Sequence, residues 1–149
     1  MFKNAKILVI DDEMVNTVVV QAILGDCGCK DVIVTTDPRQ AVVLFKESAF
    51  DLVVLDLMMP GMDGYQVMAA FSKVKPGHCV PILIVTALAD TDTEVKVFQS
   101  GATDYISKPY KPIVLTSRAG NLLKGSAPRE RFKNFNTAKR AEMNGFIRE

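Results

Sequence analysis

The sequence alternates short apolar runs with longer helical patterns, and this alternation constrains the fold more than any other feature. Three of the runs are continuous stretches of Val, Ile and Leu, which is typical of strands buried on both faces of a parallel sheet. Five strands are predicted, at residues 6–10, 32–35, 51–56, 81–86 and 104–107. Five successive βα units predict an α/β fold, with a doubly wound parallel sheet and helices on both of its faces.

Capping residues mark the helices between these strands. Asp37 precedes a proline at the first helical position, and Gln40 follows it three residues later, which is the spacing of a capping box. Pro112 opens the last helix in the same way. The capping-box spacing recurs in two further pairs, Asp63 with Gln66 and Thr91 with Glu94. Left-handed helix ends are expected at three glycines: Gly28, Gly101 and Gly125.

The composition is that of one soluble domain. A chain of 149 residues is long enough for a single core, and its net charge of +1 is too small to favour nucleic-acid binding. No apolar run approaches the roughly 20 residues of a membrane span. The three cysteines are odd in number and lack zinc-site spacing, so we expect small packing residues in a reduced, cytoplasmic compartment.

Polar residues stand where the predicted strands end. In open parallel sheets ligands bind beyond the carboxyl ends of the strands. Taken singly, each residue has an ordinary structural explanation: Asp12 could cap the helix that starts near Glu13, and Asp56 could open a turn. The residues that share this edge are Asp11, Asp12, Asp56, Thr86 and Lys108.

Together, these residues predict a phosphoryl site. Three carboxylates within about 5 Å repel one another by roughly 3 kcal/mol per pair at an effective dielectric constant near 20, and Lys108 alone cannot neutralise them. Oxygen ligands with room for water and phosphate suit Mg²⁺. Asp56 is the candidate nucleophile and Thr86 a hydrogen-bond donor to the phosphoryl group. Small residues near Asp56 are expected to leave room for the phosphoryl donor: Gly61, Gly64 and Ala87.

Four motifs in order resemble one known family. They are ILVIDDE, LVVLDLMMPGMDG, IVTALAD and GATDYISKPY, and with them residues 3–124 resemble the receiver domain of bacterial two-component response regulators. The resemblance implies the (βα)5 flavodoxin-like receiver fold with strand order 2-1-3-4-5. The resemblance also implies that residues 1–124 form the receiver domain.

The resemblance also implies a role for each site residue. Asp56 accepts a phosphoryl group from a sensor histidine kinase or a histidine phosphotransfer protein. Asp11, Asp12, Asp56 and the backbone carbonyl of Met58 hold Mg²⁺, for which Mn²⁺ can substitute. Lys108 binds a phosphoryl oxygen, and its peptide bond to the following proline is usually cis in this family.

A two-residue switch follows from the same resemblance. On phosphorylation the Thr86 hydroxyl turns towards the phosphoryl oxygen, and Tyr105 swings into the space behind it. This biases the face built from the fourth helix, fifth strand and fifth helix, where output partners dock and where a homodimer can form.

Two other functions on a similar fold fit the site less well. An aspartate-nucleophile phosphatase of the haloacid dehalogenase type needs a second acid two residues after the nucleophile, and Met58 stands there. A flavodoxin-type cofactor binder needs a phosphate-cradling loop where this chain has acidic VIDDEMVN. We therefore expect a phospho-accepting signalling domain rather than an enzyme. Weak self-phosphorylation from small donors and autodephosphorylation are expected, with Met58 and Leu88 controlling water access.

The tail, 125–149, is a separate segment. Gly-Ser-Ala-Pro reads as a break, and helical periodicity from Arg129 onward gathers apolar residues within an arc of about 120°, interrupted by Lys139. The apolar residues are Phe132, Phe135, Met143, Phe146 and Ile147. Two interpretations stay open. The tail is either an amphipathic helix that packs on its own receiver or on a second copy, or a linker that starts a truncated output region.

Overall fold

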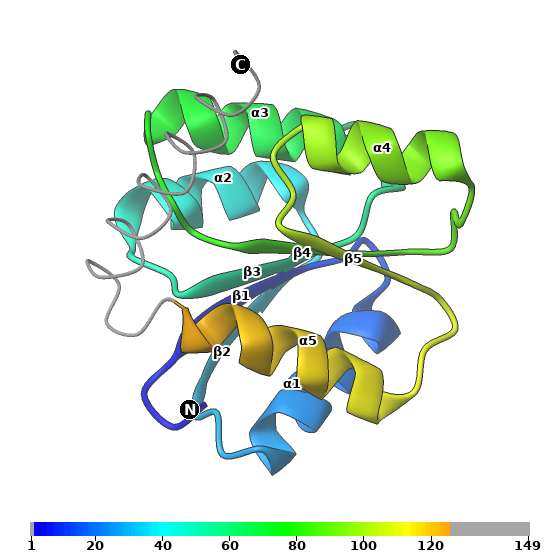
Figure 1. The fold of residues 1–149 in the computed structure, drawn as a ribbon. Coiled ribbons are helices and arrows are strands. Elements are labelled where there is room, and N and C mark those ends of the chain that lie inside the picture. Colours follow the sequence, from blue (N-terminus) through cyan, green and yellow to red (C-terminus); the bar gives the residue numbers. More distant parts are fainter. Residues whose placement is uncertain (1, 126–149) are drawn as a thin grey trace, which may run out of the picture.

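A five-stranded parallel sheet forms the centre of the computed structural model, which describes residues 2–125 (Figure 1). The strands are β1 Lys6–Ile10, β2 Asp31–Thr35, β3 Leu52–Leu55, β4 Ile82–Thr86 and β5 Asp104–Ser107. Their order is β2-β1-β3-β4-β5, which confirms the predicted doubly wound sheet and its 2-1-3-4-5 order. The predicted limits differ by one residue at three strands: β2 starts one residue earlier than predicted, whereas the prediction extended β3 by one residue at each end and β4 by one residue at its start.

Five helices cover the sheet in two layers. They are α1 Met14–Asp26, α2 Pro38–Glu47, α3 Gly64–Val74, α4 Thr91–Gln99 and α5 Pro112–Lys124. Figure 1 shows α1 and α5 on one face, and α2, α3 and α4 on the other. None of the helices within residues 2–125 has the length and apolar character needed to cross a membrane. The predicted tail, 125–149, lies outside the described residues apart from Gly125.

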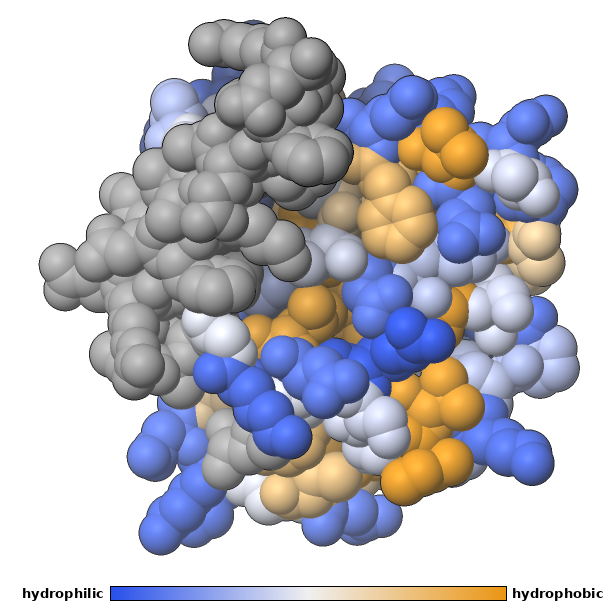
Figure 2. All heavy atoms as spheres, in the orientation of Figure 1, coloured by the Kyte–Doolittle hydropathy of each residue, from blue (hydrophilic) through white to orange (hydrophobic). Residues whose placement is uncertain are grey.

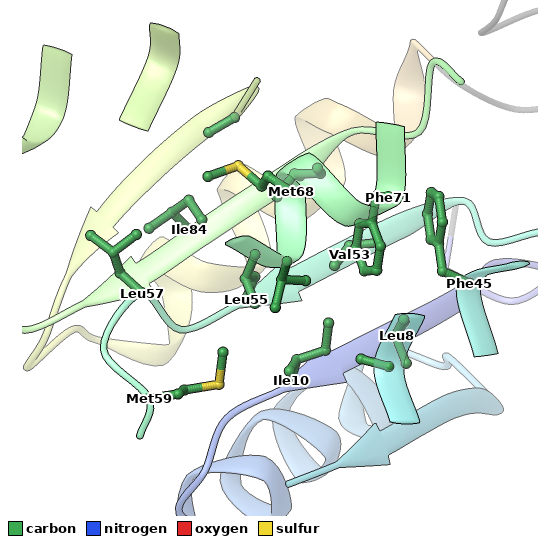
Figure 3. Packing of buried hydrophobic residues seen from close by; sticks show 14 of the residues in the cluster. Leu8, Ile10, Phe45, Val53, Leu55, Leu57, Met59, Met68, Phe71 and Ile84 are labelled. Atoms are coloured by element: carbon green, nitrogen blue, oxygen red, sulfur yellow. The ribbon is translucent and has the colours of Figure 1, made fainter. Parts of the chain in front are cut away.

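Each layer of helices buries its own apolar core against the sheet. Alternate residues of a strand point to opposite faces, so Leu8 and Ile10 pack under α2 and α3 while Ile7 and Val9 pack under α1 and α5. In the first core Phe45 of α2 stacks on Phe71 of α3 with ring centroids 3.9 Å apart (Figure 3). Burial on both faces explains why the central strands read as continuous apolar runs.

The helix caps agree with prediction in part. The capping box of Asp63 with Gln66 is present, and Asp37 caps α2 by accepting from the Arg39 amide. The predicted capping box of α2 is wrong in its second hydrogen bond, from the Asp37 amide to the Gln40 side chain. The Gln40 side chain instead accepts a hydrogen bond from the Thr35 hydroxyl at 2.7 Å. Gln40 therefore ties the start of α2 to the end of β2.

The start of α4 and the end of α5 correct the prediction. Asp90, not Thr91, is the N-cap of α4, and its carboxylate accepts from the Thr93 amide at 2.6 Å. Gly125 has a φ of −81°, so α5 ends without a left-handed residue. Gly28 and Gly101, with φ of 93° and 114°, have the predicted left-handed conformation.

Candidate functional site

Three carboxylates meet at the carboxyl edge of the sheet. Asp11 and Asp56 directly follow β1 and β3, and both are buried. Asp12, which is half-buried, completes the group, and one oxygen from each of the three lies within 4.8 Å of the others. The neighbouring strands β1 and β3 are in parallel register, with Ile10 beside Leu55, so their carboxyl ends deliver these acids to the same place.

Asp11 has a local structural role as well. Its Oδ1 accepts a hydrogen bond from the Glu13 amide at 3.0 Å, just before α1 begins. The N-cap of α1 is Glu13, whose side chain makes no capping bond. The expectation that Asp12 could cap this helix is therefore wrong, and Asp12 turns to the acidic group instead.

Lys108 supplies the cation at this edge. Its Nζ lies 2.8 Å from Asp11 Oδ2 and 3.7 Å from Asp56 Oδ1. The lysine follows β5, its amide donates to the Thr86 carbonyl at 2.7 Å, and its bond to Pro109 is cis as the family resemblance implied. A single ammonium group thus contacts two of three acids, and the site keeps an excess of negative charge.

Burial and neighbouring charges shift the pKa values in this site. Burial, reinforced by the charge of Asp11, raises the pKa of Asp56 to about 6, although Lys108 and the Leu57 amide act in the opposite direction. Burial disfavours the charged form of Lys108, but its hydrogen bond to Asp11 and the charge of Asp56 outweigh this and raise its pKa. The site therefore pairs a partly desolvated carboxylate with a firmly protonated lysine.

Thr86 and Tyr105 are linked through one residue of the β4–α4 loop. Thr86 ends β4, is fully buried, and its hydroxyl accepts from the Leu88 amide at 3.3 Å. Tyr105 lies on β5, half-buried, and its hydroxyl donates to the carbonyl of the same Leu88. The register of β3 with β4 pairs Leu55 with Ile84, so Thr86 lies near the end of the strand that adjoins Asp56.

The loop after Asp56 is held tightly against the strand end. The Gly64 amide donates to the Leu57 carbonyl at 2.8 Å. A Cβ at Gly64 would lie 2.8 Å from the Asp56 carbonyl oxygen and 2.9 Å from Leu57 Cα. We expected Gly64 to leave room for a donor, but the structure gives a different reason for the glycine, which is close contact between backbones. Met58, in the same loop, has a side chain that is 59% exposed.

A cleft of about 480 Å³ opens beside these residues, between α1 and the start of α5. Asp11, Asp56 and Lys108 lie at its polar end, and most of the remaining lining is apolar and comes from α1, β1, β3 and β4. Sequence reasoning missed this cleft and two of its polar residues, Asn16 and Tyr110. Burial raises the pKa of Tyr110, against the opposing effect of Lys108. The sequence signal was available for Tyr110 alone, two residues after the site lysine.

His78 and the three cysteines are not part of the acidic group. His78 is in the loop before β4, where its ring meets Phe45 edge-on at 4.9 Å and its Nδ1 accepts from the Val80 amide. The residue is half-buried. Cys29 and Cys79 are buried as expected of packing residues, whereas Cys27 is exposed.

Comparisons with known proteins agree on one family. The family model described as the response regulator receiver domain matches residues 7–119. The chain is 41% identical over 122 residues to a probable transcriptional regulator, ycf27, of Porphyridium aerugineum, covering 82% of this chain and 49% of that protein. It is 36% identical over 116 residues to the regulatory protein VanRB of Enterococcus faecalis, covering 78% and 50%. The chain thus spans about half the length of these curated relatives.

Solved structures resemble the fold closely. The receiver domain of the Francisella response regulator 1452 aligns with a TM-score of 0.74 and 30% identity, covering 81% of this chain and 98% of that one. The receiver domain of sensor histidine kinase PA1611 from Pseudomonas aeruginosa aligns with a TM-score of 0.73 and 29% identity, covering 80% and 98%. That structure holds a magnesium ion coordinated in its active-site cleft.

Proposed function

The chain belongs to the family of response regulator receiver domains of two-component systems, and from that premise we propose that it accepts a phosphoryl group on Asp56. The observation that supports this proposal most is the meeting of three carboxylates with one lysine at the end of β3. No ordinary capping or turn role explains a buried Asp56 beside a second buried acid. A site that receives a phosphoryl group together with a cation does explain it.

Asp56 is the nucleophile in the proposed reaction. A carboxylate oxygen attacks phosphorus, the bond from phosphorus to the donor nitrogen or oxygen breaks, and the donor leaves with that electron pair. With a pKa of about 6, the Asp56 carboxyl group is mostly ionised at neutral pH and so available for attack. Lys108, held by Asp11 at 2.8 Å, places its ammonium group beside Asp56, where it stabilises charge on the transferred phosphoryl oxygens.

The donor set fits a hard divalent cation. Asp11, Asp12 and Asp56 offer carboxylate oxygens within 4.8 Å of one another, without the nitrogen or sulfur ligands that zinc prefers. We propose that these acids hold Mg²⁺, with the Met58 carbonyl as a further ligand and Mn²⁺ as a substitute. Bound Mg²⁺ supplies positive charge that offsets the acids and the incoming phosphoryl group. The magnesium in the active-site cleft of the PA1611 receiver domain supports this assignment.

The proposed output is a change around Tyr105. The Thr86 hydroxyl accepts a hydrogen bond of 3.3 Å from the Leu88 amide, so it can be recruited by a phosphoryl oxygen on the adjoining strand. Moving Thr86 disturbs Leu88, whose carbonyl holds the Tyr105 hydroxyl. The changed face is that of α4, β5 and α5, and the phosphodonor is a sensor histidine kinase or a histidine phosphotransfer protein.

The protein is proposed to be a phosphoryl acceptor rather than a turnover phosphatase. Met58 has no titratable group, so the position two residues after Asp56 cannot act as a general acid or base. We propose that Met58, which is 59% exposed, and Leu88 control the access of water to the phosphoryl group, so that autodephosphorylation is weak.

The proposal is tested by labelling the whole chain with an acyl phosphate such as acetyl phosphate and Mg²⁺. Intact-mass measurement is expected to show one added phosphoryl group, which is absent in Asp56→Asn and absent when a chelator removes the metal. Asp63→Asn is the matched control, because this acid lies in the same loop and Asn is an equally good N-cap. Labelling that persists in Asp56→Asn, or that needs no divalent cation, would overturn the proposal.

A further inference from the structure

A buried threonine hydroxyl lies at the end of β2, beside the strand that leads to the acidic group. Thr35 is 5% exposed and is the last residue of β2, the outer strand next to β1 (Figure 1). Its Oγ1 donates to Gln40 Oε1 at 2.7 Å and accepts from the Asp37 amide at 3.1 Å. A buried hydroxyl with two partners is held in one orientation, so the end of β2 is fixed to the start of α2.

The backbone of the same residue holds Asp11. The Thr35 carbonyl accepts a hydrogen bond from the Asp11 amide at 3.3 Å, and Ile10 pairs with Thr35 in the parallel register of β1 with β2. At this contact the chain leaves β1 and turns towards α1. The hydroxyl and the carbonyl of Thr35 therefore link α2 to the turn that carries Asp11 and Asp12.

The turn from Asp11 to Glu13 needs this link because its other contacts act on a side chain. The Asp11 carboxylate accepts from the Glu13 amide at 3.0 Å and from Lys108 Nζ at 2.8 Å. Glu13, the N-cap of α1, makes no side-chain capping bond. The bond from the Asp11 amide to Thr35 is thus the contact that fixes the backbone of the turn to the sheet.

The opposite side of the turn is mostly apolar. Met14, Val15 and Ile113 are 67–71% exposed. Figure 2 shows apolar surface gathered at the lower right, where the starts of α1 and α5 lie in Figure 1. Most of the lining of the cleft between these helices is apolar as well, and its polar groups on the α5 side are Lys108 and Tyr110. The β2 side therefore supplies a polar anchor of a kind that the α5 side largely lacks.

The contact between Thr35 and Gln40 is more than a helix cap. Asp37 already caps α2, because its carboxylate accepts from the Arg39 amide at 2.9 Å. In a capping box the Gln40 side chain would accept from the Asp37 amide, but here that amide donates to Thr35. This departure ties α2 to β2 rather than to itself, which favours a positioning role.

We propose that Thr35 is a positioning residue for the acidic group and that Gln40 acts with it. The Thr35 hydroxyl fixes the end of β2, and the Thr35 carbonyl then fixes the Asp11 amide. Asp11 and Asp12 follow this backbone to the place where they meet Asp56. The inference rests on the proposed phosphoryl site, because it concerns where these acids lie when the site binds Mg²⁺.

Small displacements matter here because three acids share one cation. One oxygen from each acid lies within 4.8 Å of the others. Mg²⁺ demands nearly ideal octahedral geometry with ligands about 2.0–2.1 Å away, so it tolerates little movement of its ligands. The pairs of β1 with β2 from Lys6 to Val9 do not involve the Thr35 hydroxyl. Loss of that hydroxyl is therefore expected to loosen the site while the sheet persists.

A Mg²⁺ titration of the full chain, followed by NMR of the backbone amides, tests this role without phosphorylation. Thr35→Val keeps the shape of threonine but lacks the hydroxyl. Residues that orient metal ligands commonly change metal affinity by about 10- to 100-fold, and because Thr35 acts through the backbone we expect a loss of about 3- to 10-fold. The Asp11 amide is expected to exchange with solvent faster by a similar factor. Thr35→Ser keeps the hydroxyl and is expected to restore both properties.

Thr103→Val is the matched control. The Thr103 hydroxyl accepts from the Ile82 amide at 3.0 Å, where β4 and β5 begin, so this variant also removes a threonine hydroxyl that binds at a strand end. It does so at the edge opposite the acids. Both Val variants are expected to lower the melting temperature by about 2–4 °C, whereas only Thr35→Val is expected to change Mg²⁺ affinity.

Gln40→Leu repeats the test from α2. Gln40 is exposed, so this variant alters no buried side chain, and it is expected to weaken Mg²⁺ binding in the same direction. Combined with Thr35→Val it is expected to add little, because both changes remove the same contact.

The possible failures are distinguishable. Wild-type Mg²⁺ affinity in Thr35→Val, or equal losses of affinity in Thr35→Val and Thr103→Val, would overturn the positioning role alone. A wild-type chain in which the amides of Asp11, Asp12 and Asp56 do not respond to Mg²⁺ would overturn the proposed metal site, and the positioning role with it.

Discussion

At the scale of single residues, Lys108 balances two buried acids. Its Nζ contacts Asp11 and Asp56. Burial and the charge of Asp11 raise the pKa of Asp56, and the positive charge of Lys108 acts in the opposite direction. We predict that Lys108→Met slows acyl-phosphate labelling of Asp56 by about 100-fold, because one charged donor to a transferred group contributes on that order. Intact-mass time courses measure the rate. Lys111→Met, which removes an exposed lysine three residues away, is expected to label at the wild-type rate. Wild-type labelling by Lys108→Met would exclude the proposed role.

Gly64 shows a different residue-scale constraint, set by backbone contact. We predict that Gly64→Ala lowers the free energy of unfolding by about 1–3 kcal/mol, since its Cβ would lie 2.8 Å from the Asp56 carbonyl oxygen. Gly25→Ala is the matched control, because Gly25 lies in the last turn of α1 and a Cβ added there would have no heavy atom within 4 Å. There we expect a stabilisation of about 0.4–1 kcal/mol. Urea denaturation measures both, and equal effects would show that the contact is relieved without cost.

The sequence predicted that the three acids meet at one edge of the sheet, but it did not predict the close backbone contact that requires a glycine at position 64. Asp11, Asp12 and Asp56 were found because each follows an apolar run, and a parallel sheet brings such ends together. The role of Gly64 depends on how closely α3 returns to the end of β3, which is a tertiary distance that no local pattern contains. Tyr110 stands two residues after Lys108 in the sequence, but its burial in the cleft depends on how α5 packs on α1, which the local sequence does not show.

At the scale of elements, the start of α4 shows how a local pattern becomes ambiguous. The sequence Asp90-Thr91-Asp92-Thr93 contains adjacent residues able to cap a helix, and spacing alone selected Thr91. The structure selects Asp90 through its bond to the Thr93 amide. Strands were predicted more closely because burial on both faces leaves a continuous apolar run, whereas a cap depends on one hydrogen bond.

The cap assignment predicts a pH-dependent effect. Hydrogen bonds from Thr93 lower the pKa of Asp90, so its stabilising contribution is present above the unfolded pKa near 3.8 and is lost as the pH falls through the lowered folded value. We predict that Asp90→Ala lowers the melting temperature at neutral pH, and that its difference from wild type shrinks below about pH 4. Thr91→Ala is expected to melt close to wild type at both pH values. A larger effect from Thr91→Ala would restore Thr91 as the cap.

At the scale of the whole molecule, the sheet edge connects the acidic site to a distant face. β4 ends in Thr86 and the neighbouring β5 carries Tyr105, and both hydroxyls bind the backbone of Leu88. Sequence reasoning predicted the two switch residues from the family resemblance, but it did not predict Leu88 as their common partner. The Leu88 amide binds Thr86 and the Leu88 carbonyl binds Tyr105. Such backbone contacts depend on the folded position of the loop, so the side-chain sequence does not predict them.

This connection predicts that removing one hydroxyl separates phosphorylation from its effect. In Thr86→Ala we expect Asp56 still to bind beryllium trifluoride with Mg²⁺, because the acids and Lys108 are unchanged, while the response of Tyr105 falls to less than about half of the wild-type shift. Fluorotyrosine NMR measures this directly, since the chain has 3 tyrosines and the signal of Tyr110, which lies in the cleft with Lys108, reports that beryllium trifluoride has bound. Thr86→Ser keeps the hydroxyl and is expected to retain the response. If Tyr105 shifts equally in Thr86→Ala, the change reaches β5 without the Thr86 hydroxyl, and the path through Leu88 is wrong.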